Sequence, residues 1–338
     1  MTQKPKISII TIVKNGMPNL IDNLESFKKQ KYKNKELIVV YSKSDDKTLK
    51  ILKSSKNIKK IIYQKKPNLY GAINLGLKNT SGDVIGILHS DDIFFSSKSL
   101  EIVMKSYIKD KFDIAYGNIL ISKKNNFKNI LRNWKSKPFK RNYLKYGWMP
   151  PHVSIFISKK NKNIIYNESY KISADYLYIL KILNRNKIIR YIDSYITIMK
   201  TGGISTNHII KLKEDLFIAK KYFKYYYLTI FLKIVRKFIQ YKPVKINFDT
   251  KYINFFKKKK YNFTTDVSRI LKHKRFILSA FNLAYLAFVH NKININKKYI
   301  YLWPDGITSQ LFLKKKKIPG RLILKRLKKD KSFENVYL

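Results

Sequence analysis

The chain has 338 residues and no cysteine, which excludes disulfide bonds, thiolate metal sites and cysteine nucleophiles. Its five histidines make a multi-histidine zinc site a poor expectation. The formal net charge of +51 at pH 7 predicts a surface that attracts polyanions such as nucleotide diphosphates, anionic lipids and nucleic acids.

Strand-like apolar runs alternate with helical patterns along the first third of the chain. Strands are predicted at 7–13, 36–40, 58–63, 84–88 and 114–116, and helices around 20–27, 49–52, 70–78 and 100–107. This alternation predicts an α/β fold with a mainly parallel central sheet and helices on both faces. The first turn, 14–18, is not GxGxxG, and no GxxxxGK[ST] occurs, which disfavours dinucleotide enzymes and P-loop NTPases.

Two adjacent carboxylates, Asp91 and Asp92, follow the apolar strand predicted at 84–88. Placing them at the end of a buried strand costs free energy unless a cation or a hydrogen-bonding ligand compensates. In open α/β sheets, ligands bind at this edge. The alternative is that the pair caps the helix that follows.

The middle of the chain is predicted to be less regular. A helix with Leu177, Leu180 and Leu183 facing inward follows Asp175, and a strand follows at 188–192. Residues 257–260 are predicted to be a linker, 266–291 a helix and 299–303 a strand.

Residues 222–241 are predicted to form one basic amphipathic helix. The expected apolar face has Ile230, Phe231, Ile234, Val235 and Phe238, and the expected polar face has Lys233, Arg236, Lys237 and Gln240. Such a helix suits an anionic membrane surface. The alternative is a helix that packs on the core with its lysines outward.

The order of the motifs along residues 6–210 resembles the family 2 glycosyltransferases, above all the subgroup that makes bacterial capsule, O-antigen and colanic-acid-type polysaccharides. The motifs are ISIITIVKN, ELIVV with a polar turn, LYGAINLG, SGDVIGILHSDD, a Pro-His turn, SADY and GGIS. The resemblance implies a GT-A fold, a nucleotide-sugar donor, a glycan or lipid-linked acceptor, inverting transfer, and Mg²⁺ or Mn²⁺ as cofactor.

The resemblance also implies roles for individual residues. Asp92 would ligate the metal, and Asp91 would hold the metal or the donor ribose, because oxygen ligands suit hard cations. Asp175 matches the catalytic base, although it could instead cap the helix that follows. His152 matches an acceptor-side histidine, or makes a structural hydrogen bond. The donor-binding positions are Thr11, Asn15, Tyr41 and Gly203, the last in a loop with Gly202 and Ser205.

Two positions depart from this pattern: the family usually has an aspartate where this chain has Tyr41, and the subgroup often has one where it has Gly71. They leave open a catalytically impaired scaffold with the same fold. A nucleic-acid-binding protein is the other alternative; it is disfavoured because no compact recognition motif occurs, so no specific nucleic-acid partner is expected.

A second, fainter resemblance covers residues 275–338. The segments SAFNLAYLAFVHNK, YLWPDGI with Asp305, and KKIPG resemble the opening of the WecG/TagA/CpsF glycosyltransferases, although Gly320 precedes Arg321 where that family has an aspartate. We therefore predict a GT-A domain at 1–215, a basic amphipathic helix with a linker at 216–262, and a partial C-terminal domain at 263–338.

The expected location is cytoplasmic. The N-terminal sequence runs directly into a strand without a signal-peptide pattern. No run approaches the ~18 apolar residues of a membrane-spanning helix. The family resemblance and the basic amphipathic segment add a peripheral position at the inner face of the cell membrane to this expectation.

Overall fold

The computed structural model describes residues 4–123, 126–201, 208–240, 252, 262–263, 277–281 and 300–304. The chain divides into two compact units, 1–254 and 255–338. The predicted division at 1–215, 216–262 and 263–338 remains a prediction.

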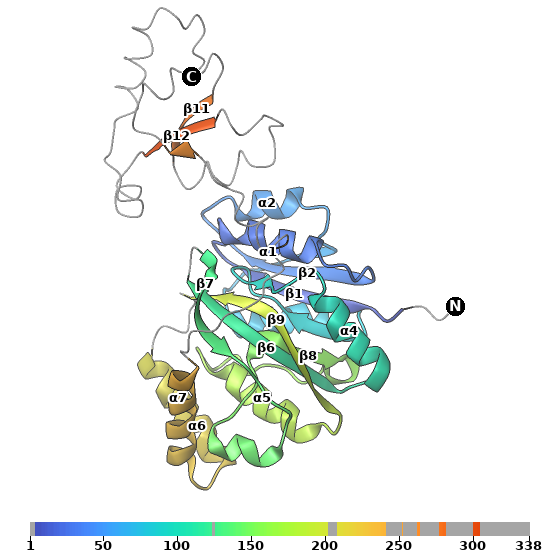
Figure 1. Ribbon diagram of the computed structural model, residues 1–338, viewed down its shortest axis with the longest axis vertical. Helices are drawn as coiled ribbons and strands as arrows, with labels where there is room; N and C mark the ends of the chain where they lie inside the picture. Colours follow the sequence, from blue (N-terminus) through green and yellow to red (C-terminus); the bar gives the residue numbers. More distant parts are fainter. Residues whose placement is uncertain are drawn as a thin grey trace, which may run out of the picture. The chain divides into compact units, whose positions relative to one another are not determined.

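The first unit is built on one nine-stranded sheet with the order β3-β2-β1-β4-β8-β6-β9-β5, and β7 pairs with β6 (Figure 1). The strands are β1 (Ile7–Val13), β2 (Lys35–Ser42), β3 (Lys60–Gln64), β4 (Val84–Ile87), β5 (Ile93–Phe94), β6 (Ile114–Lys123), β7 (Asn126–Trp134), β8 (Ile155–Ser158) and β9 (Ile189–Lys200). The first four strands run parallel, and so do β6 and β9, whereas β5, β7 and β8 are antiparallel to their neighbours. The predicted α/β fold with a mainly parallel sheet is confirmed.

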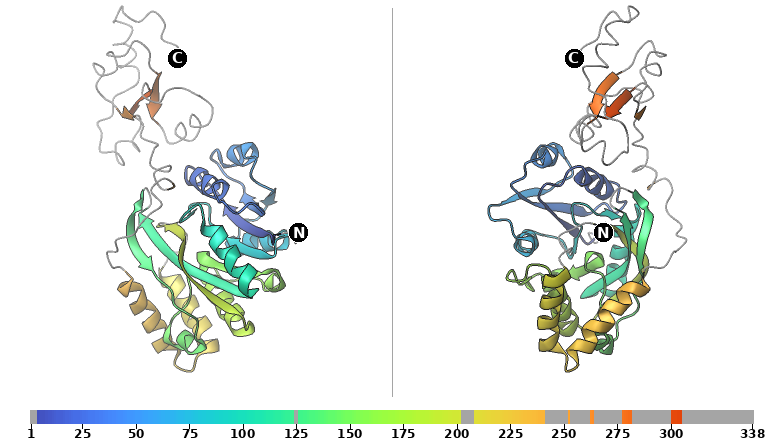
Figure 2. Two further views of the ribbon diagram at one scale, coloured as in Figure 1. Left: turned by 45° about the vertical axis from the view of Figure 1, so that its right-hand side comes forward. Right: turned by 90° about the vertical axis from the view of Figure 1, so that its left-hand side faces the viewer.

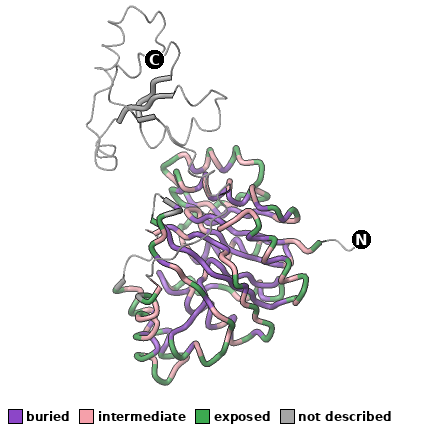
Figure 3. The backbone as a smooth tube through the Cα atoms, in the orientation of Figure 1, coloured by how far each residue is buried: buried purple, intermediate pink, exposed green. Residues whose placement is uncertain are grey.

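Helices cover both faces of this sheet. They are α1 (Asn19–Lys28), α2 (Thr48–Ser54), α3 (Leu69–Lys78), α4 (Ser99–Asp110), α5 (Ala174–Arg185), α6 (His208–Tyr222) and α7 (Tyr226–Ile239). Because side chains of a strand alternate between faces, Ile7 and Ile9 of β1 pack with α1, α2 and α4, whereas Ile10 and Ile12 pack with α3 and α5. Every residue of β1 is therefore buried (Figure 3).

The helix predicted at 222–241 is wrong in its bounds, and the side that the structure buries is not one of its two predicted faces. α6 ends at Tyr222 and α7 begins at Tyr226, and Figure 2 shows the two helices side by side. Lys233, which the alternative of a core-packed helix placed outward, is largely buried, whereas Phe231 of the expected apolar face is 61% exposed. An ion pair inside the fold accounts for this reversal: Lys233 Nζ lies 2.9 Å from a carboxylate oxygen of buried Asp215.

The described part of the second unit contains three parallel strands in the order β10-β12-β11. These are β10 (Asn262–Phe263), β11 (Ile277–Phe281) and β12 (Ile300–Pro304). The strand predicted at 299–303 is confirmed, but the helix predicted at 266–291 is wrong over β11. A short apolar run does not distinguish a helix from a strand, and pairing with β12 decides for the strand. Asp305, Gly320 and the linker at 257–260 lie outside the described residues.

Candidate active site

The chain turns sharply after β4, at the carboxyl edge of the sheet. The backbone N–H of Asp92 donates to the carbonyl of His89 at 2.9 Å and so closes the turn. The buried Asn23 side chain of α1 holds the turn from below, because its Nδ2 donates to the carbonyls of His89 at 2.7 Å and Asp92 at 3.1 Å. The position of Asp91 and Asp92 is therefore fixed by the core and not by the loop alone.

Asp92 is 1% exposed, and the fold satisfies only half of its carboxylate. Its Oδ1 accepts the backbone N–H of Lys200 at 3.0 Å, whereas Oδ2 has no hydrogen-bond partner in the described part of the chain. Burial, with a smaller contribution from the charge of Asp91, raises the pKa of Asp92 well above its usual value. This carboxyl group favours a proton or a cation at Oδ2.

The neighbouring Asp91 is only partly buried. Within the residues that the structure describes, no three histidine, aspartate or glutamate side chains gather into a metal-binding group. The Asp91–Asp92 pair, with its unpartnered buried oxygen, still fits a hard cation that takes its other oxygen ligands from a bound phosphate, as Mg²⁺ commonly does.

The residues after β8 and before α5 come to the same edge. The ring centroids of His89 and His152 are 6.1 Å apart, and His152 Nε2 lies 2.7 Å from the hydroxyl of Tyr166. Burial lowers the pKa of His152 to about 4, although the Asp175 carboxylate acts in the opposite direction. Burial likewise lowers the pKa of His89. Both imidazoles are therefore neutral at pH 7.

Asp175 lies in the first turn of α5 and is near enough to act on the pKa of both histidines and of Tyr70 and Tyr166. Its Oδ1 accepts the N–H of Tyr176 at 2.7 Å, which leaves the second carboxylate oxygen for another partner. Glu214 of α6 anchors the segment that leads into this turn. Its carboxylate accepts three successive backbone N–H groups, those of Lys171, Ile172 and Ser173, at 2.8–3.0 Å.

The predicted donor-side residues lie along the same edge, at the ends of β1 and β2. The hydroxyl of buried Thr11 donates to the carbonyl of Leu88 at 2.9 Å and joins β1 to the site turn. Asn15, with a φ of 48°, accepts the N–H of Asp45 at 2.9 Å. The Tyr41 ring lies 5.4 Å from that of Tyr63. Gly202, Gly203 and Ser205 lie outside the described residues.

Gly71 is explained by a carboxylate from a distant part of the sequence. A Cβ at this position would lie 2.8 Å from Oε2 of Glu168 and 3.2 Å from Nε2 of Gln64. Asn74 of α3 holds Glu168 there by donating to its Oε1 at 2.9 Å. The chain thus brings an acidic group to the place where the family pattern led us to expect one at position 71.

The structure therefore gathers four of the predicted site residues, Asp91, Asp92, His152 and Asp175, at one end of the sheet. Sequence reasoning missed His89, Tyr166 and Glu168 as members of this site. His89 adjoins the two aspartates and could have been included on that ground. Tyr166 and Glu168 carry no local signal, because only the packing of their segment on α3 brings them in.

Known proteins similar to this chain are glycosyltransferases. The family profile described as Glycosyl transferase family 2 matches residues 8–162. An uncharacterized glycosyltransferase of Rickettsia bellii is 37% identical over 113 residues, which are 33% of this chain and 16% of that protein. The Escherichia coli UDP-Glc:alpha-D-GlcNAc-diphosphoundecaprenol beta-1,3-glucosyltransferase WfgD is 35% identical over 121 residues, 35% of this chain and 47% of that protein.

The fold has a solved counterpart in S. aureus TarS 1–349 in complex with UDP-GlcNAc. The TM-score is 0.51 at 18% identity, and the match covers 64% of this chain and 66% of that one. The chain spans less than half the length of the curated relatives named above. The match to glycosyl transferase family 2 covers residues 8–162, a little less than half of the chain.

Proposed function

We propose that this protein is an inverting, metal-dependent glycosyltransferase that moves a sugar from a nucleotide-sugar donor to a glycan or lipid-linked acceptor in surface polysaccharide synthesis. The observation that carries the proposal is the meeting of Asp91 and half-satisfied Asp92 with Asp175 at the carboxyl edge of the sheet. The Asp91–Asp92 pair suits a donor diphosphate with its cation, and Asp175 suits an acceptor hydroxyl.

On the donor side, Asp91 and Asp92 would hold Mg²⁺ or Mn²⁺, which neutralises the charge that grows on the leaving diphosphate. Asp91 is the more accessible of the two, and Asp92 fixes the turn through its bond to Lys200. We therefore assign the direct contact with the cation to Asp91 first and to Asp92 Oδ2 second. Asn15 and Tyr41 lie where a nucleoside would extend along the ends of β1 and β2.

On the acceptor side, Asp175 would accept the proton of the acceptor hydroxyl while that oxygen attacks the anomeric carbon. Attack from the side opposite the diphosphate inverts the configuration at that carbon. The neutral His152, hydrogen-bonded to Tyr166, would orient the acceptor without adding a positive charge that competes for the Asp175 carboxylate.

The name of the E. coli relative supports a lipid diphosphate-linked acceptor, and the TarS complex supports a nucleotide-sugar donor. A lipid-linked acceptor would place this protein at the inner face of the cell membrane. None of the helices in the described ranges is long and apolar enough to cross a bilayer, so we propose peripheral attachment.

The test is release of nucleoside diphosphate from a panel of nucleotide sugars, with Mn²⁺ or with a chelator. We expect release with one donor class only when metal is present, and a loss of about 1,000-fold for Asp91→Asn, which corresponds to several kcal/mol of transition-state stabilisation. The matched control is Asp110→Asn, because Asp110, the last residue of α4, forms an ion pair with Arg190 of β9. If the rate of nucleoside diphosphate release is the same with and without metal and is unchanged by both substitutions, the metal role is refuted.

The catalytically impaired scaffold is the competing outcome of the same assay. Such a protein would bind a nucleoside diphosphate without releasing it from any sugar donor. The carboxylate of Glu168 beside Gly71 favours the active enzyme, because the acidic group absent from position 71 is present in space.

A further inference from the structure

The outward side of α7 is apolar. Tyr227, Leu228, Phe231 and Ile234 are 68%, 51%, 61% and 41% exposed, respectively. Their spacing of one, three and three residues places them on one face of the helix. Thr229 and Ile230, on the side of α7 that packs on the rest of the domain, are buried. A globular protein normally turns such an apolar stripe toward its core, so this face is available for a partner.

Contacts on the inner side of α7 hold it in this orientation. Thr229 Oγ1 donates to the carbonyl of Lys145 at 2.7 Å, and Lys233 pairs with Asp215 at 2.9 Å. Gly147 has a φ of 71° and lets the backbone of α7 approach so closely that a Cβ there would lie 2.4 Å from Lys233 N. The apolar face is therefore presented to the outside by a rigid attachment.

The charge around this face selects the partner. Between Asp215 and Asp249 the sequence has eight lysines and arginines and no acidic residue. Exposed Lys224 precedes the stripe, and exposed Lys237 lies near its end. Apolar side chains bordered by cations match a bilayer with anionic headgroups. A second copy of this chain would bring another charge of +51 against the first.

The same helix lies close to the proposed catalytic group. Lys233 Nζ is 3.4 Å from the ring centroid of Tyr176, the residue that follows Asp175 in α5. The Asp175 carboxylate acts on the pKa of Lys233, although burial has the larger effect and lowers that pKa. A surface bound through α7 would thus stand in a fixed relation to the acceptor side of the site.

We propose that the outward face of α7 (Tyr227, Leu228, Phe231 and Ile234) docks the protein on an anionic lipid bilayer. The apolar side chains enter the interfacial region, and the bordering lysines contact the headgroups. This attachment brings the catalytic domain to the surface where a lipid-linked acceptor is presented. The inference deepens the proposed function, but the docking itself requires no sugar transfer.

Vesicle sedimentation of the full chain tests the docking. We expect binding to vesicles of phosphatidylglycerol and phosphatidylcholine, weaker binding at high salt, and little binding to phosphatidylcholine alone. The double variant Tyr227→Gln/Phe231→Gln should bind about tenfold more weakly or worse, because it removes two aromatic groups from the interface. The matched control Ile108→Gln, at a 49% exposed position of α4, should bind as the wild type does.

Three outcomes would overturn the proposal: no binding of the wild type to anionic vesicles, unchanged binding of the double variant, or a dimer in sedimentation velocity that the double variant dissolves. Donor hydrolysis in the absence of vesicles should be the same in the wild type and the double variant. Binding to vesicles without donor hydrolysis would refute the proposed transferase activity but not the docking. Donor hydrolysis without binding to vesicles would refute the docking but not the activity.

Discussion

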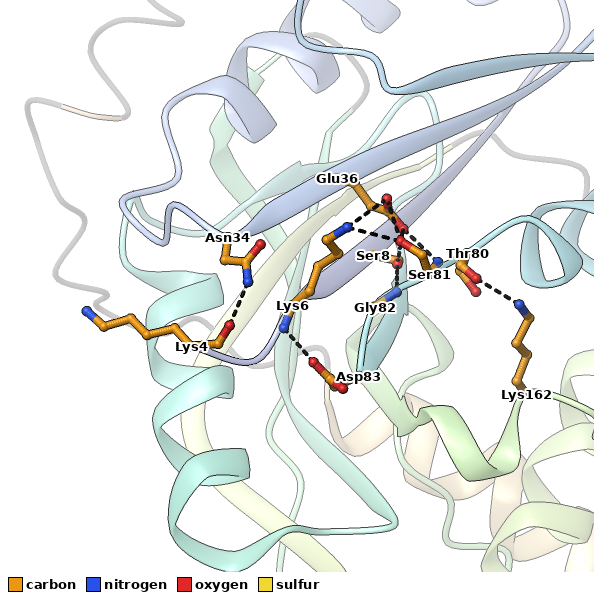
Figure 4. A network of polar contacts seen from close by, with 10 residues as sticks. All are labelled: Lys4, Lys6, Ser8, Asn34, Glu36, Thr80, Ser81, Gly82, Asp83 and Lys162. Atoms are coloured by element: carbon orange, nitrogen blue, oxygen red, sulfur yellow. Dashed lines mark hydrogen bonds and ion pairs between the residues drawn. The ribbon is translucent and has the colours of Figure 1, made fainter. Parts of the chain in front are cut away.

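The two edges of the parallel sheet each hold a buried carboxylate, and the pKa values of these two groups are shifted in opposite directions. At the amino edge, Glu36 of β2 accepts hydrogen bonds from Ser8 Oγ at 2.6 Å and from the N–H of Ser81 at 2.8 Å, and Lys6 Nζ lies 3.7 Å away (Figure 4). Burial raises the pKa of Glu36, but these partners together lower it below its usual value. At the carboxyl edge, burial and Asp91 raise the pKa of Asp92.

The difference separates stability from function. Both carboxylates are buried, and they belong to β2 and to the turn after β4, two strands that both pair with β1, so burial alone does not distinguish them. The fold supplies donors for Glu36 and leaves Asp92 Oδ2 without one in the described part of the chain. A buried carboxylate that the fold compensates only in part persists where a ligand uses it, and in α/β sheets that place is the carboxyl edge.

The largest effect should come from Asp175→Asn at the carboxyl edge. The amide keeps the shape and can still accept the N–H of Tyr176, but it cannot take a proton from an acceptor hydroxyl. Sugar transfer at saturating donor should fall by about 10²–10⁴-fold. Donor affinity by calorimetry and the free energy of unfolding in urea should stay unchanged. Transfer within a factor of two of the wild type would remove Asp175 from the mechanism.

Glu36→Gln at the amino edge should show the opposite pattern. The neutral amide weakens several hydrogen bonds to a buried charge, so the free energy of unfolding should fall by about 3 kcal/mol while transfer at low temperature persists. Because the folded pKa of Glu36 is lowered, its stabilisation is fully present above the unfolded pKa near 4.5 and is lost as the pH falls through the folded value. Urea unfolding should therefore show the two proteins converging at acidic pH. A variant that loses activity but not stability would reverse the assignment of this edge.

The strands that form these two edges could be predicted from the sequence. The run ISIITIV is β-branched and buried on both faces, and the predicted bounds 7–13 are those of β1. The order of the motifs also indicated that Asp91, Asp92, His152 and Asp175 would meet. This prediction came from the family resemblance, and in the structure Asp91 and Asp92 follow β4, His152 precedes β8 and Asp175 lies in the first turn of α5.

Contacts between residues far apart in the chain could not be predicted from the sequence. Nothing near position 200 indicates that its backbone N–H would satisfy half of Asp92, and nothing near 168 indicates a carboxylate beside Gly71. The periodicity of residues 222–241 predicted an amphipathic helix, but not that Lys233 would be buried and Phe231 exposed. Asp215, 18 residues from Lys233, determines that orientation.

Asp92→Asn should change stability in the direction opposite to Glu36→Gln. The amide can keep the bond from Lys200 and removes a buried charge, so the metal-free variant should be more stable than the wild type by about 1 kcal/mol at pH 7. Because the folded pKa of Asp92 is raised, the penalty of the ionised form appears only above the unfolded pKa near 3.8. The gain should therefore vanish at acidic pH in thermal unfolding experiments. A loss of stability at pH 7 would show that the fold does use this charge.

The smallest effect should come from Lys6→Met, at the rim of the amino-edge network. The Lys6 side chain is 37% exposed and its Nζ lies 3.7 Å from Glu36, so solvent screens most of this attraction. The free energy of unfolding should fall by about 0.5 kcal/mol or less, and high salt should remove the difference. A loss near that of Glu36→Gln would mean that the ion pair, and not the hydrogen bonds from Ser8 and Ser81, compensates the carboxylate. The contrast between the two edges would then come from a nearby cation. Lys6 would supply that cation to Glu36, and a bound metal ion could supply one to Asp92.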